Sequence, residues 1–175
     1  GHDVLSEPAV IQAAQERWGN DVVDADGQLI RAAIAARVFG RDPQAVAELA
    51  FWESQTHPRI TALVVAELER LAMRQKSAET PQVVILDAAV LLKAGWSRLC
   101  DHLLFIDSPH QNRLARATQR GWSAENFAAR EAAQLPLQEK KEKSTGVIDN
   151  SGTLEQTYSQ VLDFWNSLSP REEGH

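Results

Sequence analysis

The sequence predicts an α/β protein built on a parallel sheet, and three short apolar runs are the main reason. Val83–Asp87, His102–Asp107 and Gly146–Asp149 each hold consecutive apolar residues, and each closes on an aspartate. Runs of this length are too short for typical helices and are characteristic of strands buried on both faces of a sheet. Helix-like segments separate the runs, which favours βαβ units.

The first third of the chain is predicted to be helical. Pro8–Trp18 is rich in Ala, Gln and Glu, and Gln28–Phe39 places its apolar residues on one face. Asp42-Pro43 combines an N-cap with proline at the first helical position, so a helix is expected to run toward Gln55. We expect His57-Pro58 to break this helix, because proline has no N–H to donate.

Two further helices are expected later in the chain. Apolar residues from Ile60 to Leu71 follow helical spacing, and this helix is expected to fade in the polar stretch 76–82. Thr153 and Gln156 form a capping-box pattern for the last helix, and residues 171–175 are expected to be frayed. An open parallel sheet usually has more than three strands, so a further strand is expected before residue 1.

Composition limits the class of protein. The 175 residues carry a net charge of −6, which weighs against a general nucleic-acid binder. The longest nearly unbroken apolar run, Val83–Leu92, has 10 residues and contains Asp87, so no bilayer-spanning helix is expected. The single Cys100 cannot form an internal disulfide, and no cationic, apolar leader opens the chain. We therefore expect a cytoplasmic protein without a membrane partner.

The aspartates that close the three runs are the first candidate site. Ligands of open α/β sheets bind beyond the carboxyl ends of the strands, where Asp87, Asp107 and Asp149 would gather. A carboxylate there can hold Mg²⁺ through water or position a hydroxyl nucleophile. The alternative is that each aspartate only caps the following turn or helix.

A cationic segment is the second candidate. Residues 113–143 contain seven basic and four acidic side chains, a net charge of +3, which leaves −9 for the rest of the chain. Arg113, Arg116 and Arg120 are spaced to share one helical face, and guanidinium groups suit phosphates because they donate two parallel hydrogen bonds. A nucleotide phosphate is the expected ligand, and a solvated helix face is the alternative.

The third candidate is the polar loop Asn150-Ser151-Gly152, which follows an expected strand and could meet a purine edge. The same residues are also typical of any tight turn. Neither G-x-x-x-x-G-K-[S/T] nor G-x-G-x-x-G occurs among the 175 residues, and there is no Cys/His metal-binding cluster.

These residues together resemble the dephospho-coenzyme A kinase family, a member of the nucleoside-monophosphate-kinase branch of P-loop proteins. The similarity covers about residues 1–168 in the family's order and spacing. The matching segments are Gly1–Leu5, His57–Ile60, Val84–Asp87 with Leu91-Leu92, Asp107–Pro109 with Arg116 and Arg120, Ala129–Pro136 with Lys140, and Val147–Gly152.

The resemblance implies a three-layer α/β/α parallel sheet with a helical substrate lobe and a lid. Residues 1–7, 81–120 and 144–170 would form the core, 8–80 the lobe that takes the CoA substrate, and 121–143 the lid. The implied reaction transfers the γ-phosphate of ATP to the ribose 3′-hydroxyl of dephospho-CoA, the last step of coenzyme A biosynthesis. The implied partners are ATP, with Mg²⁺, and dephospho-CoA, and the expected state is a monomer or a weak homo-oligomer.

The resemblance also implies roles for particular residues. Catalytic cations would be supplied by Arg116, Arg120, Arg130 and Lys140, with Gln134 closing from the lid. The nucleotide would contact Arg116, Arg120, Asn150, Ser151 and Gly152. Dephospho-CoA would lie near His57 and Leu91, although His57 could equally have a packing role. Asp87 would hold Mg²⁺ through water.

The chain departs from the family pattern at several positions. The family's P-loop and first Asp-Ala-Asp segment, which carries its general base, would lie before Gly1. Lys93 replaces an acid, Thr145 replaces an aspartate, and Arg113 stands where Gln is frequent. Without a P-loop, residues 1–175 are not expected to phosphorylate anything. The alternatives are a degenerate homologue that binds nucleotide or CoA, and another small-molecule kinase of the same branch.

Overall fold

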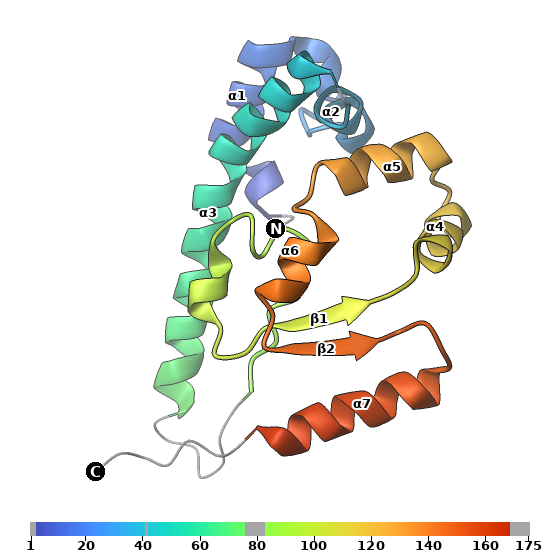
Figure 1. Cartoon of the computed structure of the whole chain (residues 1–175). Coiled ribbons are helices and arrows are strands. Elements are labelled where there is room, and N and C mark those ends of the chain that lie inside the picture. Colours follow the sequence, from blue (N-terminus) through green and yellow to red (C-terminus); the bar gives the residue numbers. More distant parts are fainter. Residues whose placement is uncertain (1–2, 41, 76–82, 169–175) are drawn as a thin grey trace. The chain divides into compact units, whose positions relative to one another are not determined.

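A computed structural model describes residues 3–40, 42–75 and 83–168 (Figure 1). The chain divides into two compact units, Gly1–Ala89 and Val90–His175. The first unit is helical, and the second combines helices with a parallel sheet. The predicted α/β class with a parallel sheet is therefore confirmed.

The first unit contains α1 (Pro8–Trp18), α2 (Arg31–Val38) and α3 (Pro43–Gln75). Short 3₁₀ turns at Asp3–Ser6 and Asn20–Val22 precede and follow α1. Gly19 ends α1 at a φ of +87°, in the left-handed region that glycine enters without strain. The buried core of this unit consists of Ala14 of α1, Val22 of the turn that follows it, and Ile34 and Val38 of α2.

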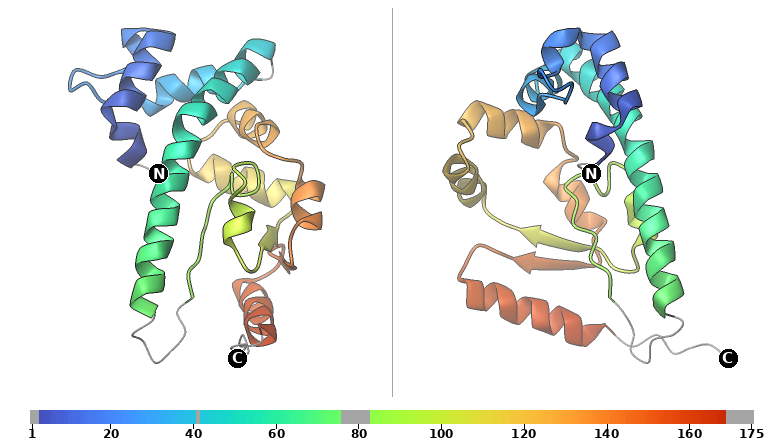
Figure 2. Two further views of the ribbon diagram at one scale, coloured as in Figure 1. Left: turned by 90° about the vertical axis from the view of Figure 1, so that its left-hand side faces the viewer. Right: turned by 180° about the vertical axis from the view of Figure 1, so that it is seen from behind.

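Helix α3 contradicts the expected break at His57-Pro58. It spans 33 residues with Pro58 inside, and its ribbon is continuous along the whole length (Figure 2). Side chains supply hydrogen bonds to carbonyls around the proline: Arg59 Nη1 donates to Gln55 O at 2.6 Å, and Thr61 Oγ1 donates to His57 O at 2.7 Å. Such donors partly offset the disturbance of the backbone ladder, so the prediction of a break from local sequence was wrong.

The second unit is organised around strands β1 (Leu104–Asp107) and β2 (Gly146–Asp149). They pair in parallel, with Leu104 opposite Gly146 and Asp107 opposite Asp149. The connection between them contains α4 (His110–Gln119), α5 (Ala124–Ala132) and α6 (Leu137–Glu142). A 3₁₀ turn at Trp96–Leu99 precedes β1. Two of the three expected strands are thus confirmed.

Helix α7 (Leu154–Ser167) follows β2 and lies beside it (Figures 1 and 2). The predicted capping box starts this helix, because Thr153 accepts from Gln156 N and Gln156 Oε1 accepts from Thr153 N. The approach of α7 to β2 is close: a Cβ on Gly146 would lie 2.6 Å from Cε2 of Phe164. Glycine at the start of β2 therefore makes room for the aromatic ring.

The expected strand Val83–Asp87 does not form. These residues have no regular secondary structure, and the exposed fraction of Ile85 is 87%. A strand requires a hydrogen-bonded neighbour, and within the described residues β1 and β2 pair only with each other. An apolar run alone therefore predicted a strand that its surroundings do not support.

The expectations for residues 1–2, 76–82 and 171–175 lie outside the described residues. None of the helices in the described part of the chain is both long and apolar enough to cross a bilayer.

Candidate functional site

The carboxyl ends of β1 and β2 bring two of the three predicted acids together. Asp107 and Asp149 are directly opposite each other in the parallel register. Asp107 Oδ2 accepts from Lys141 Nζ of α6 at 2.9 Å, so a cation from the connection reaches the end of the sheet. Lys141 belongs to the cationic segment, but no sequence pattern indicated that it would pair with this acid 34 positions away.

Asp149 is held in its charged form. Hydrogen bonds from Ser151 lower the pKa of the Asp149 carboxyl, and the bond from the Ser151 side chain has a larger effect than the bond from its backbone. The charge of Lys141 lowers this pKa by a smaller amount. Ser151 N donates to Asp149 Oδ1 at 2.9 Å, which closes a turn directly after β2. Asp149 therefore also has the capping role that was the alternative interpretation of the strand-end acids.

Ser108 connects the predicted nucleotide-binding segments. It follows β1 and is buried, with 6% of its surface exposed. Its Oγ accepts from Arg116 Nη1 at 3.4 Å and donates to Asn150 O at 3.4 Å. Asn150 N in turn donates to Asp107 O at 2.7 Å. The predicted residues Arg116 and Asn150 are thus brought to the same end of the sheet.

The loop 150–152 is tied on both sides. Asn112 Nδ2 of α4 donates to Ser151 O at 3.4 Å, and Thr157 Oγ1 of α7 donates to Asn150 Oδ1 at 3.1 Å. A Cβ on Gly152 would lie 2.0 Å from Oε1 of Gln156, so a larger residue there would displace the Gln156 side chain that completes the capping box. The bonds to Ser151 and Asn150 orient the Asn150 amide.

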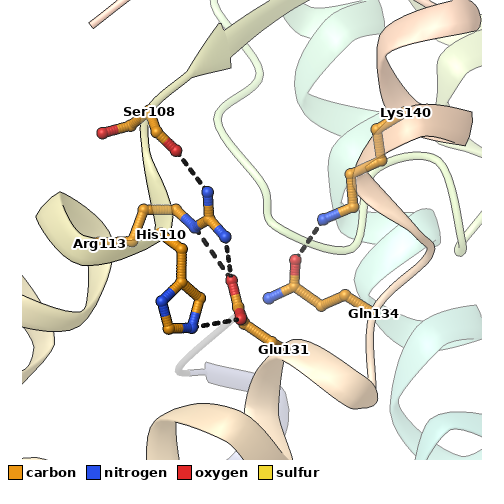
Figure 3. A network of polar contacts seen from close by, with 6 residues as sticks. All are labelled: Ser108, His110, Arg113, Glu131, Gln134 and Lys140. Carbon is orange, nitrogen blue, oxygen red and sulfur yellow. Dashed lines mark hydrogen bonds and ion pairs between the residues drawn. The ribbon is translucent and has the colours of Figure 1, made fainter. Parts of the chain in front are cut away.

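Figure 3 shows polar contacts that link α4 to α5 and a separate contact between the turn after α5 and α6. Arg113 of α4 binds Glu131 of α5, with Nε 2.9 Å and Nη2 2.6 Å from Glu131 Oε1, and its Nη1 donates to Ser108 O. Gln134 Oε1 accepts from Lys140 Nζ. The structure therefore brings together the two predicted lid residues Gln134 and Lys140, and it adds Glu131, which the sequence analysis did not single out.

Lys140 is partly buried. Burial lowers the pKa of its ammonium group, the nearby Glu131 opposes that lowering, and Arg113 adds to it. A partly desolvated ammonium group interacts more strongly with an anion than an exposed one does.

The other predicted cations have separate surroundings. Arg116 is exposed on α4, and Arg120 is the exposed residue that ends this helix. Arg130 of α5 is half-buried, with its guanidinium carbon 4.4 Å from the centre of the Trp122 ring. The expected single helical face therefore holds for Arg113 and Arg116 within α4, while Arg120 lies just beyond its last turn.

Three of the predicted site residues precede the strands in the sequence and belong to other elements. His57 lies on α3 and is half-buried, and Asp87 is exposed in the irregular segment, both in the first unit. Leu91 is half-buried in a turn at the start of the second unit, where its carbonyl accepts from Trp96 N at 2.9 Å. The ligand roles expected for His57, Asp87 and Leu91 therefore stay predictions.

Two of the departures from the family pattern have structural partners. Lys93 Nζ donates to Ala133 O, at the end of α5, at 3.2 Å. Thr145 Oγ1 accepts from Leu103 N at 2.9 Å and donates to Leu103 O at 3.0 Å, so it joins the starts of the two strands.

Within the described residues no group of three or more His, Cys, Asp or Glu side chains could hold a metal ion. A pocket of about 320 Å³ lies in the first unit, lined by Trp18, Arg37, Asp42, Glu48 and their neighbours. None of the predicted site residues lines this pocket.

Comparisons with known proteins identify the family. The family model described as "Dephospho-CoA kinase" matches residues 4–156. A protein of Chlorobaculum tepidum named dephospho-CoA kinase is 34% identical over 168 residues, which are 94% of this chain and 76% of the relative.

Solved structures agree with this result. The crystal structure of TT1252 from Thermus thermophilus has a TM-score of 0.62 at 30% identity and covers 93% of this chain and 82% of its own. The dephospho-CoA kinase from Campylobacter jejuni has the same TM-score at 19% identity, covering 96% and 80%, and supports the fold. The order of motifs, the parallel sheet and these matches lead to one conclusion: the chain belongs to the dephospho-CoA kinase family.

Proposed function

We propose that this chain is the larger part of a dephospho-CoA kinase that transfers the γ-phosphate of ATP to the ribose 3′-hydroxyl of dephospho-CoA. The observation that carries the proposal is the convergence at buried Ser108. There Arg116 and the loop 150–152 meet the carboxyl ends of β1 and β2. In open α/β sheets this edge is where ligands bind, and family membership supplies the reaction.

In this proposal the cations act by position and charge. Phosphoryl transfer leaves little covalent chemistry to the protein, so its catalysis is mainly orientation and neutralisation of negative charge. Arg116 and Arg120 would contact the nucleotide, and Asn150, Ser151 and Gly152 would line the adenine pocket. Arg130 and Lys140 would close over the phosphates with Gln134 and exclude water that would otherwise hydrolyse ATP.

The substrate side of the proposal rests on the resemblance. Residues 8–80 would form the lobe that takes dephospho-CoA, with His57 and Leu91 near the substrate. Residues 121–143 would form the lid, and residues 1–7, 81–120 and 144–170 the core. The lid range contains the two short helices α5 and α6, which contribute Glu131 and Lys140 to the polar contacts of Figure 3.

A single carboxylate, that of Asp87, is the protein group proposed to hold Mg²⁺. Asp87 presents an exposed carboxylate, and Mg²⁺ in kinase sites keeps several waters and uses few protein carboxylates. We therefore propose that Asp87 holds the ion through water. The ion would supply neutralisation of phosphate charge.

The phosphate-binding loop is the remaining requirement. Residues 1–175 contain no G-x-x-x-x-G-K-[S/T] motif, and we propose that the gene encodes one before residue 1. The reading frame before Gly1 tests this directly: the motif followed about 20 residues later by Asp-Ala-Asp supports the kinase. A native start at Gly1 would instead favour the homologue that binds nucleotide or CoA without transferring phosphate.

The decisive experiment is an ADP-release assay on the full-length protein with ATP, Mg²⁺ and either dephospho-CoA or nucleoside monophosphates. We expect turnover with dephospho-CoA and little with the monophosphates. Residues 1–175 expressed alone are the matched control and should give no turnover, because they lack the backbone nest that holds the β- and γ-phosphates. Absence of turnover with dephospho-CoA would refute the assignment, and turnover with a monophosphate would favour another kinase of the branch.

A further inference from the structure

Arg113 differs from its helical neighbour Arg116 in what it contacts. Its Nε and Nη2 both donate to Glu131 Oε1, at 2.9 and 2.6 Å, and its Nη1 donates to the carbonyl of Ser108. Figure 3 shows the guanidinium group between these two partners. Arg113 therefore links the end of β1, through Ser108, to helix α5.

These contacts use the part of Arg113 that would bind a phosphate. Guanidinium groups bind phosphates through two parallel N–H donors, and in Arg113 both Nε and Nη2 already donate to the carboxylate of Glu131. The pair is partly shielded from water, since 24% of the Arg113 side chain and 32% of the Glu131 side chain are exposed. Binding a phosphate along this edge would require breaking a partly desolvated ion pair.

The position of Glu131 in α5 indicates that it depends on Arg113. Glu131 lies in the last turn of α5, where the helix dipole disfavours a negative charge. Arg113 compensates this charge, and Nε2 of His110 also lies 3.8 Å from Glu131 Oε2. The His110 ring also packs edge-on against Phe127 of α5, with ring centres 5.4 Å apart. All three contacts join α4 to α5.

We propose that Arg113 and Glu131 form a latch that holds α5 against α4, so that Arg113 positions the lid and does not bind phosphate. The inference deepens the proposed function and rests on it for the identity of α5 as part of the lid. The latch fixes α5 relative to the helix that carries Arg116. The latch also keeps Glu131 close to Lys140, where its negative charge favours the charged form of the Lys140 ammonium group.

The test is a double-mutant cycle in the full-length protein with Arg113→Ala, Glu131→Ala and the combined variant. Amide hydrogen exchange of residues 124–132 reports the latch, and kcat and KM for ATP report its effect on the reaction. We expect each single change to speed exchange in α5 about tenfold and to raise KM for ATP more than it lowers kcat. The combined variant should change exchange by less than the sum of the two single effects, because both single changes remove the Arg113–Glu131 pair.

Two further variants sharpen the result. Lys143→Ala breaks the exposed Lys143–Glu139 pair of α6 and should leave exchange in α5 unchanged. Arg113→Lys keeps the charge without the paired donors and should restore the exchange rate only in part.

The latch would be refuted if the two single effects simply added. It would also be refuted if Arg113→Ala cut kcat while Glu131→Ala left it intact, the pattern of a direct phosphate ligand. Hydrogen exchange is measured without substrate, so it tests the latch even if the wild-type protein does not phosphorylate dephospho-CoA. Failure of the proposed function and failure of the latch are therefore separate results.

Discussion

At the scale of single residues, Arg116 is the predicted catalytic cation that contacts Ser108, the residue directly after β1. It is exposed, and its hydrogen bond to Ser108 Oγ is long, at 3.4 Å. Its side chain therefore contributes little to the stability of the unit. In the proposed function its guanidinium group remains available to the nucleotide.

We predict that Arg116→Ala lowers ATP-dependent turnover of the full-length protein by about 100-fold or more, because a preorganised charge in a phosphoryl-transfer site is lost. The free energy of unfolding should change by less than about 0.5 kcal/mol, as for other exposed substitutions. Arg98→Ala, at an exposed arginine of the same unit, is the control and should leave both unchanged. An Arg116→Ala protein that unfolds would make this arginine structural.

Cys100 allows a prediction about pH. Burial, and to a smaller extent the charge of Asp101, raises the pKa of its thiol, and its Sγ donates weakly to Trp96 O at 3.7 Å. A raised pKa means a smaller thiolate fraction at any given pH, and the thiolate is the reactive form.

The rate of iodoacetamide labelling of Cys100 should therefore reach its midpoint at a higher pH in the folded protein than in urea. Peptide mapping by mass spectrometry measures the rate at this position, and the protein unfolded in urea is the reference. A midpoint at lower pH in the folded protein would mean that the thiol lies in an electropositive site.

At the scale of elements, α3 is where local sequence and structure disagree most clearly. Proline in a helix interior costs about 3 kcal/mol relative to alanine, and the sequence predicted a break for this reason. The helix continues instead, and Arg59, besides its bond to Gln55 O, pairs with Glu7 at 3.2 Å.

Because α3 is continuous, Pro58→Ala should raise the free energy of unfolding by about 1 to 3 kcal/mol, since it restores a backbone donor for Ser54 O. Urea unfolding followed by circular dichroism measures the change. Pro43→Ala is the matched control and should not stabilise, since Pro43 follows the N-cap Asp42, whose Oδ1 accepts from Ala45 N. No gain from Pro58→Ala would indicate that the chain is broken there in solution.

The three expected strands also show a difference between local sequence and structure. The runs ending at Asp107 and Asp149 pair with each other, while the run ending at Asp87 remains irregular. All three have similar sequences, so composition could not separate them. The difference arises because a strand exists only with a hydrogen-bonded neighbour, whose presence is not a local property.

At the scale of the whole molecule, the distribution of charge along the chain was the property that best located the candidate site. The sequence predicted that residues 113–143 form a cationic surplus of +3 on an acidic chain. Arg113, Lys141 and Lys143 form ion pairs with Glu131, Asp107 and Glu139. The four cations for which the family resemblance implies catalytic roles are other members of the segment: Arg116, Arg120, Arg130 and Lys140.

Short-range patterns in the chain suffice for α1, α2, the capping box of α7, the α/β class and the family motifs, because periodicity, caps and motif spacing act over a few residues. They did not suffice for α3, which continues through Pro58. Tertiary structure was needed to assign the partners. It joined Arg113 to Glu131 across 18 positions and Lys141 to Asp107 across 34. It also left Val83–Asp87 unpaired within the described residues. These outcomes depend on which distant groups meet in space, and no local pattern encodes that meeting.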